Sequence, residues 1–217
     1  MPTRAVAAYA LRPSWRGWIH AVAAMLAVPG AVLLVATADH PMAKFAATIY
    51  GLGIVLGFGT SACYHRLAWS DRSHKILRRM DHSMIFVLIA GTYTPVCLVA
   101  LPKAWGIPLF VVVWTGAITG IVLKQVAFDR FRVVQHALYP MLGWAAVVSL
   151  PALVHSLSGP ALALLLSGGL LYTFGIPVLA RRRPDPWPRI FGYHEIWHAA
   201  TVLAGVCHFV MIALVVT

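Results

Sequence analysis

Apolar residues fill seven stretches of the chain, and short polar segments separate them. The stretches cover residues 18–37, 45–68, 82–101, 105–123, 133–155, 161–180 and 194–216. Each is about 20 residues long, the length of an α-helix that crosses the hydrocarbon core of a bilayer. The pattern therefore predicts an all-α membrane protein with seven transmembrane helices, which form a single membrane domain over residues 1–217.

The first stretch also has features of a signal peptide. Three arginines precede it, and an A-x-A sequence at residues 36–38 imitates a cleavage site. Its apolar run, however, is nearer to about 20 residues than to the roughly 7–15 of a signal-peptide core. We therefore expect an uncleaved first transmembrane helix.

Basic residues in the polar segments predict how the helices are oriented. All but two of the 17 Lys and Arg residues lie in four segments: the one before the first span and the loops at 66–80, 124–132 and 181–189. The two exceptions are Lys44 and Lys103. Because Lys and Arg accumulate in cytoplasmic loops, the N-terminus is expected in the cytoplasm and the C-terminus outside it. The expected location is the bacterial cell membrane, with several crossings.

Composition supports this interpretation and excludes others. The chain is 60% hydrophobic and only 11% charged, with a mean hydropathy of +0.81, far from the usual values of soluble domains. A net charge of +11 could indicate nucleic acid, but the basic residues lie in short loops where anionic lipid headgroups would meet them. We therefore expect membrane lipids as partners and no nucleic acid. The three cysteines lie in apolar stretches without C-x-x-C spacing, so no disulfide framework is expected.

Three local signals refine the expected helices. Pro95 lies inside the third span, within Gly91-Thr92-Tyr93-Thr94-Pro95, and predicts a kink there. Three prolines exclude a helix from the loop at 181–189. Residues 70–80 are basic and could form a short helix that lies on the inner leaflet.

The candidate chemistry begins with His194-Glu195-Ile196-Trp197-His198, at the start of the last apolar stretch. Histidines four residues apart share one face of a helix and can hold one metal ion between them. Zinc takes three or four ligands, so this pair needs a further ligand from elsewhere in the chain.

The predicted topology indicates where that ligand lies. The second span ends at Ser61-Ala62-Cys63-Tyr64-His65 and the third begins at Asp81-His82, both at the cytoplasmic depth expected for the start of the seventh. His65 is therefore the natural third ligand, and Ser61 is a hydroxyl one helical turn deeper on the same face. Three imidazoles and a water form an open, catalytic type of zinc coordination, in which Asp81 would hold the water.

Other roles remain open for these residues. Asp81 could cap the third span, Ser61 could bond to a carbonyl of its own helix, and Glu195 could be an acidic residue of a first helical turn. His82 could support the site from behind or contact a headgroup. The remaining histidines are expected at the membrane interfaces: His20, His40, His74, His136, His155 and His208.

Four motifs of the chain, taken in order, resemble the hemolysin III family. They are the Ser61-x-x-x-His65 pair, Asp81 after a basic loop, the segment at 91–95 and the closing His194-x-x-x-His198 pair. The hemolysin III proteins are bacterial members of the progestin and adipoQ receptor superfamily. The resemblance covers all seven spans and implies seven helices with an intramembrane zinc on the cytoplasmic side. It also implies that the three histidines are the zinc ligands and that Asp81 and Ser61 hold the metal water.

Three functions follow as hypotheses. The first is a zinc-dependent hydrolase of a lipid amide or ester, as the related adiponectin receptors and alkaline ceramidases suggest, in which Asp81 accepts a proton and Ser61 binds the oxyanion. The second is a haemolytic channel or a regulator of membrane properties with structural zinc. The third is an H-E-x-x-H protease with Glu195 as base, although the motif lies on the last span and leaves no later helix to supply an acidic ligand.

Overall fold

The computed structural model describes residues 12–217, and residue 132 is described in its backbone only. Over this range its elements are helical apart from an isolated bridge between Trp187 and Phe191. The spans, in order, are α2 (Trp18–Thr37), α3 (Pro41–Leu67), α4 (Asp71–Pro95) with the π-helix η1 (Val96–Ala100), α5 (Lys103–Val126), α6 (Arg132–Gly143) with the 3₁₀-helix η2 (Ala145–Ser149) and α7 (Leu150–Ser156), α8 (Gly159–Arg181), and α9 (Tyr193–Val216). Seven helical segments are long and apolar enough to cross a membrane. The predicted all-helical, seven-span membrane fold is confirmed.

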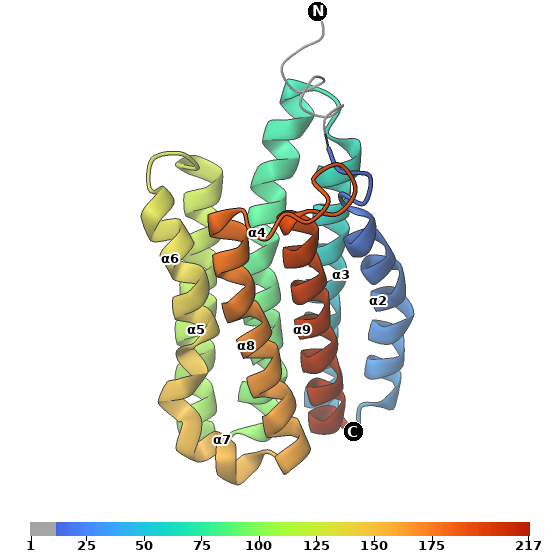
Figure 1. Cartoon of the computed structure of the whole chain (residues 1–217). Helices are drawn as coiled ribbons and strands as arrows, with labels where there is room; N and C mark the ends of the chain where they lie inside the picture. The colour runs from blue at the N-terminus through green and yellow to red at the C-terminus, as the bar shows by residue number, and fades with distance from the viewer. Residues whose placement is uncertain (1–11) are drawn as a thin grey trace, which may run out of the picture.

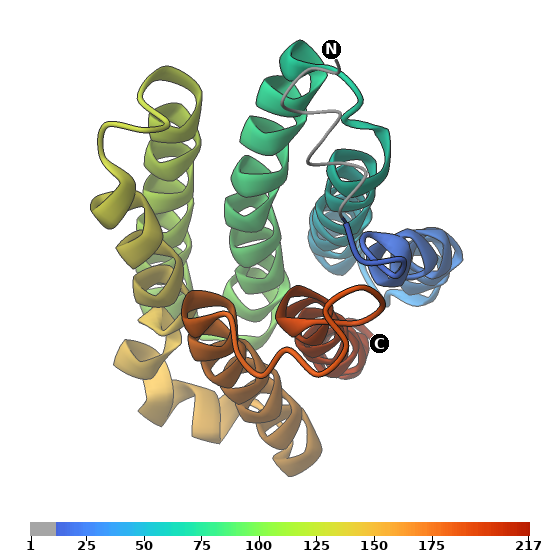
Figure 2. The same ribbon diagram turned by 45° about the horizontal axis from the view of Figure 1, so that its top comes forward.

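The spans follow one another round a bundle (Figures 1 and 2). Helix α3 packs between α2 and α4, α8 packs along α9, and α9 returns to contact α2. The start of α2 and the basic loops after α3, α5 and α8 lie at one end, and the C-terminus lies at the other (Figure 1). Which of these ends faces the cytoplasm stays a prediction from the distribution of charge.

Small residues let the central helices approach closely. A side chain at Gly53 of α3 would meet the carbonyl of Val87 on α4 at 3.3 Å, and one at Gly91 of α4 would meet the carbonyl of Ile49 on α3 at the same distance. Lipid gives apolar helices little reason to associate, so close backbone packing of this kind stabilises contacts between spans. This close packing holds α3 and α4 in a defined position relative to each other.

Residues 70–80 do not form a separate helix on the membrane surface, and that prediction is wrong. Ser70 caps α4 by accepting the Ser73 N–H at 3.1 Å, and the helix then runs without interruption to Pro95. No glycine or proline stands between the basic turns and the apolar span, so nothing ends the helix there. The first turns of α4 extend beyond the neighbouring helices instead (Figure 1).

The irregularity expected at Pro95 is present as a π-helical turn. Pro95 ends α4, and in η1 the Leu101 N–H donates to the Val96 carbonyl at 2.9 Å, five residues back. Thr94 donates its hydroxyl to the Ala90 carbonyl at 2.8 Å and accepts the Trp114 Nε1–H at 3.1 Å. The Thr94 side chain thus provides hydrogen-bond partners for the Ala90 carbonyl and the Trp114 Nε1–H, which lipid could not provide.

The same segment explains why the fifth span is broken into α6, η2 and α7. The Tyr93 hydroxyl donates to the Gly143 carbonyl at 2.9 Å and accepts the Ala146 N–H at 2.8 Å. One side chain of α4 therefore replaces backbone bonds where α6 ends. The loop between α8 and α9 is non-helical, as its three prolines predict.

Replacement of Gly106 tests the packing of α5 on η1. A Cβ at this position would overlap the backbone carbonyl of Cys97, which cannot move as a flexible side chain would. We expect Gly106→Ala to lower the free energy of unfolding by about 1–3 kcal/mol, through overpacking. Thermal unfolding in detergent, followed by circular dichroism, measures the change.

Gly169→Ala is the matched control, because a Cβ on this α8 glycine has no neighbour within 4 Å. It should be neutral or stabilising by up to about 1 kcal/mol, the usual helix preference for alanine. Equal stability of the two variants would contradict the packing argument.

Candidate metal centre

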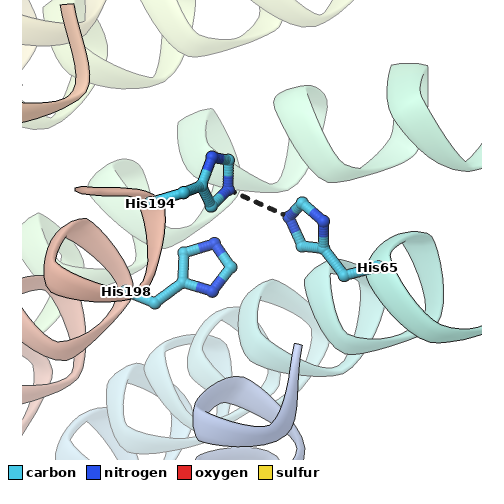
Figure 3. Close-up of side chains that lie close together, drawn as sticks. All are labelled: His65, His194 and His198. Atoms are coloured by element: carbon cyan, nitrogen blue, oxygen red, sulfur yellow. Dashed lines mark hydrogen bonds between the residues drawn. The ribbon is translucent and has the colours of Figure 1, made fainter. Parts of the chain in front are cut away.

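Three histidines converge at the end of the bundle where α2 begins (Figure 3). His65 lies in the last turn of α3, and His194 and His198 lie in the first two turns of α9. One ligand nitrogen from each lies within 4.8 Å of the other two, and the Nε2 atoms of His65 and His194 are 3.3 Å apart. Two of the three side chains are buried and that of His194 is half-buried. The structure therefore brings the i, i+4 pair of α9 together with His65, the third histidine that the predicted topology places at the same depth.

A buried ion pair fixes the first turn of α9. Glu195 is fully buried, pairs with the Arg16 guanidinium and accepts the Gly192 N–H at 2.9 Å. Glu195 is thus an acidic residue in the first turn of a helix, one of the roles that the sequence leaves open for it, and the N-terminal end of the helix dipole favours a negative charge there. Both carboxylate oxygens are engaged, so Glu195 is held away from the three histidines.

Residues 12–17, here called the pre-helical segment, lie against the end of α3. Arg12 donates to the His65 carbonyl at 2.8 Å, while the Ser14 N–H donates to the carbonyl of Arg189 at 3.0 Å. Gly17 has a φ of 83°, and a Cβ there would be 2.8 Å from the Cβ of His65. Only glycine fits this close approach without strain. The pre-helical segment therefore covers the candidate centre at the end of the bundle.

His20 lies at the centre rather than at a membrane interface, and the expectation for this residue is wrong. Its ring stacks on that of His198, with centroids 3.9 Å apart and planes 14° apart. The Thr201 hydroxyl donates to the His198 carbonyl at 2.8 Å, so the His20 Nε2–H donates to that hydroxyl at 2.9 Å. His20 starts the first span at the predicted cytoplasmic depth, and the argument that selected His65 would have found it.

His208 was also expected at an interface, and that expectation is wrong too. It lies in the second half of α9, and its Nε2 bonds to the carbonyl of Leu165 on α8 at 3.3 Å. Its ring fills the space beside Gly168. His208 is therefore a contact between two spans, far along α9 from His194 and His198.

Ser61 and Asp81 come from the packed helices α3 and α4. Ser61 is buried one helical turn from His65, and the Asp81 side chain is partly buried. Asp81 lies ten residues inside α4, so its alternative role as a cap is wrong. Among the described residues, the group with ligand atoms within 4.8 Å contains the three histidines and not Asp81. Asp81 is therefore not a member of this ligand group.

His82 lies on the far side of Asp81. Its Nδ1–H donates to the Arg78 carbonyl at 2.8 Å and lies 3.8 Å from the Asp81 carboxylate. Its ring packs edge-on against Phe128, and its carbonyl accepts the Tyr139 hydroxyl at 2.9 Å. These contacts fix the turn of α4 that carries Asp81.

One separation among the three histidines matches a tetrahedral metal ion such as zinc, and all three ligand atoms lie within 4.8 Å of one another. With Zn–N bonds of about 2.05 Å, two ligand nitrogens of a tetrahedron stand about 3.3 Å apart. The Nε2 atoms of His65 and His194 have this separation in the structure. A centre with three imidazoles leaves a fourth position for water or substrate, as catalytic zinc sites do.

Comparisons with known proteins agree with these features. A family model described as "Haemolysin-III related" matches residues 8–209, a range that includes every residue of the candidate centre. The chain is 34% identical to "Hemolysin-3 homolog" of Bacillus subtilis (strain 168) over 189 residues, which are 86% of this chain and 85% of that protein. It is 33% identical to "Hemolysin-3" of Bacillus cereus over 182 residues, which are 82% of this chain and 80% of that protein.

Arg16→Met tests the ion pair that fixes α9. The change leaves the Glu195 carboxylate buried without its cation, which typically costs about 3–5 kcal/mol. We expect a clear fall in melting temperature in detergent. Arg16→Met/Glu195→Gln should recover part of the loss, because a neutral amide oxygen can still accept the Gly192 N–H.

Arg189→Met is the control, since the Arg189 side chain is exposed at the same end of the bundle. Its melting temperature should match that of the wild type. An Arg16→Met protein as stable as this control would show that the ion pair contributes nothing.

Proposed function

The chain belongs to the hemolysin III family, and on that premise we propose that it is a zinc-dependent hydrolase of a lipid amide or ester in the bacterial cell membrane. The observation that carries the proposal is the convergence of His65, His194 and His198. Two spans far apart in sequence, α3 and α9, supply the three imidazoles, and we assign to the same site Ser61 of α3 and Asp81 of the neighbouring α4. Metal ligands, an acid and a hydroxyl are the groups that hydrolysis of a carbonyl compound uses.

The surroundings support a lipid as substrate. The three histidines lie in the end turns of helices that are themselves membrane spans, and large apolar side chains cover the outer faces of these spans. A molecule that reaches the site from the bilayer has its reactive carbonyl near the polar interface and its chains beside the helices. Soluble substrates would have to pass the pre-helical segment, which lies across the end of α3.

A bound zinc ion would supply Lewis acidity and would lower the pKa of water to about 7. The chain's own residues do the rest. Asp81 orients the attacking water and accepts its proton on the carboxylate, from a position outside the ligand group. We assign the Ser61 hydroxyl to donate to the oxygen that becomes negative as the carbonyl is attacked. Burial limits competing water at both groups.

Glu195 is poorly suited to the base of an H-E-x-x-H protease. Its carboxylate is paired with Arg16 and accepts the Gly192 N–H, so its oxygens are committed to the start of α9. Asp81 is the acid that we assign as base instead, and its described ion-pair neighbour is His82, whose Nδ1 lies 3.8 Å from the carboxylate.

Metal analysis tests the ligand set. We expect purified wild-type protein to contain one zinc ion per chain and His194→Ala/His198→Ala to contain none, because one remaining imidazole cannot hold the ion. His155→Ala should keep full zinc, since His155 is exposed at the opposite end of the bundle. Inductively coupled plasma mass spectrometry gives the content. Full zinc in the double variant would contradict the site.

Asp81→Asn tests the proton acceptor. We expect zinc to be retained while kcat falls by about 10²–10⁴-fold, the usual contribution of a general base. The assay measures fatty acid released in detergent from two fluorescent lipids, one with an N-acyl amide and one with an O-acyl ester.

Asp129→Asn is the matched control, because this carboxylate is exposed in the loop after α5. Its turnover should equal that of the wild type. Absence of turnover by the wild type on both lipids, or equal turnover by Asp81→Asn, would contradict the hydrolase and favour a structural metal.

A further inference from the structure

We propose that His20 is a positioning residue of the metal centre, and that its stacked ring holds His198 in the orientation that metal binding requires. His20 is buried near the start of α2 and is outside the group of three ligand atoms. The inference rests on the proposed function, because it concerns one of the candidate ligands. It adds a side chain from a third span to a group that α3 and α9 supply.

The ring of His198 needs a contact that orients it. The torsion between Cβ and a histidine ring has broad minima, so the helix backbone does not by itself fix the plane of the ring. A zinc-bound histidine is usually oriented by a hydrogen bond that its second ring nitrogen donates. In Figure 3, Nε2 of His198 lies on the side of His194, whereas Nδ1 is buried and has no hydrogen-bond partner among the described residues. No described hydrogen bond therefore fixes the plane of this ring.

The ring of His20 provides such a contact by stacking. Its centroid is 3.9 Å from that of His198, and the two planes differ by 14°. The other rings described beside His198 belong to His65 and His194, and their planes are inclined to it by 58° and 70°. Rotation of the His198 ring about its bond to Cβ would lose the parallel contact with His20. This stacking therefore favours a single orientation of the ring.

His20 is itself held by a ring and by a hydrogen bond. Phe58 of α3 packs against it, with ring centroids 5.0 Å apart. The His20 Nε2–H donates to the Thr201 hydroxyl at 2.9 Å, and that hydroxyl donates to the His198 carbonyl at 2.8 Å. His20 is thus linked, through Thr201, to the backbone of the residue whose ring it stacks on. A side chain held in this way can fix the plane of its neighbour.

Charge also favours this arrangement when a metal ion is bound. An imidazole that binds zinc takes up part of the positive charge, and the face of a neutral aromatic ring attracts positive charge. One nitrogen of His20 donates to Thr201, and the other, Nδ1, has no described partner to accept a proton from it. This is the hydrogen-bonding pattern of a neutral imidazole. His20 can therefore lie against a metal ligand without repelling the ion.

Zinc affinity tests the assignment. Purified full-length protein in detergent is stripped of metal and titrated with Zn²⁺ in competition with a coloured chelator of known affinity. We expect His20→Ala to weaken zinc binding about 10–100-fold, the usual effect of removing a group that supports a metal ligand. A second titration uses Co²⁺, whose visible absorption reports the geometry of its ligands. The cobalt spectrum of His20→Ala should differ from that of the wild type.

Two milder variants separate the ring of His20 from its hydrogen bond. His20→Phe keeps an aromatic ring for stacking and loses the donor, so it should recover at least about fivefold of the zinc affinity that His20→Ala loses. Thr201→Val removes the hydroxyl at nearly constant shape. It should weaken zinc binding by up to about tenfold, the effect of one lost hydrogen bond.

His208→Ala is the matched control. This histidine also lies in α9 and contacts a neighbouring span, since its Nε2 bonds to the Leu165 carbonyl of α8 at 3.3 Å. Its removal should lower the melting temperature in detergent but leave zinc affinity within about twofold of the wild type. The comparison separates a loss of stability from a loss of ligand orientation.

The outcomes distinguish this proposal from the proposed function. Unchanged zinc affinity and an unchanged cobalt spectrum in His20→Ala would overturn the positioning role, while zinc binding by the wild type would leave the metal centre in place. An equal loss of affinity in His208→Ala would overturn it too, because general stability would then explain the effect. Weaker zinc binding in His20→Ala, together with a wild type that releases no fatty acid, would support the positioning role and contradict only the hydrolase.

Discussion

The buried ion pair between Arg16 and Glu195 joins the first span of the bundle to the last. Apolar helices in lipid gain little from hiding apolar surface, because their surroundings are already apolar. Polar contacts and close packing must therefore fix how the spans meet. Here the ion pair holds the first turn of α9 against the segment before α2, and it thereby positions His194 in that turn and His198 in the next. Breaking the pair would leave a charge buried without compensation.

The centre is built from several spans at one depth, and each contributes a different kind of contact. Helix α3 supplies His65 and Ser61, and α9 supplies the i, i+4 pair. Helix α2 supplies His20, which supports the ring of His198 from behind. Helix α4 carries Asp81 ten residues after its start, and its first turns extend beyond the neighbouring helices (Figure 1). Because α4 begins beyond the ends of its neighbours, Asp81 in its interior lies near the level of those ends.

The sequence predicts what depends on the bilayer and on local spacing. The seven spans follow from hydrocarbon thickness, and the histidine cluster follows from their alternating direction together with the i, i+4 rule. Features that depend on which helices become neighbours were missed. Tyr93 breaks the fifth span from a helix 50 residues away in sequence, and Arg16 meets Glu195 across 179 residues. The continuation of α4 through residues 70–80 was missed because amphipathic composition predicts a surface location but does not mark an end of the helix.

The five residues from His194 to His198 show how neighbours decide the chemistry of a motif. Helical geometry turns Glu195 about 100° from His194 whatever the surroundings are. In this bundle the two histidines face α3, where His65 joins them, and the glutamate meets a guanidinium from the pre-helical segment. A carboxylate neutralised in this way stabilises a helix terminus and is a poor proton acceptor. The base that we propose is then Asp81, which belongs to a different helix. The same H-E-x-x-H letters therefore supply two members of a candidate metal centre and a structural anchor here, and the carboxylate that we propose as base belongs to α4.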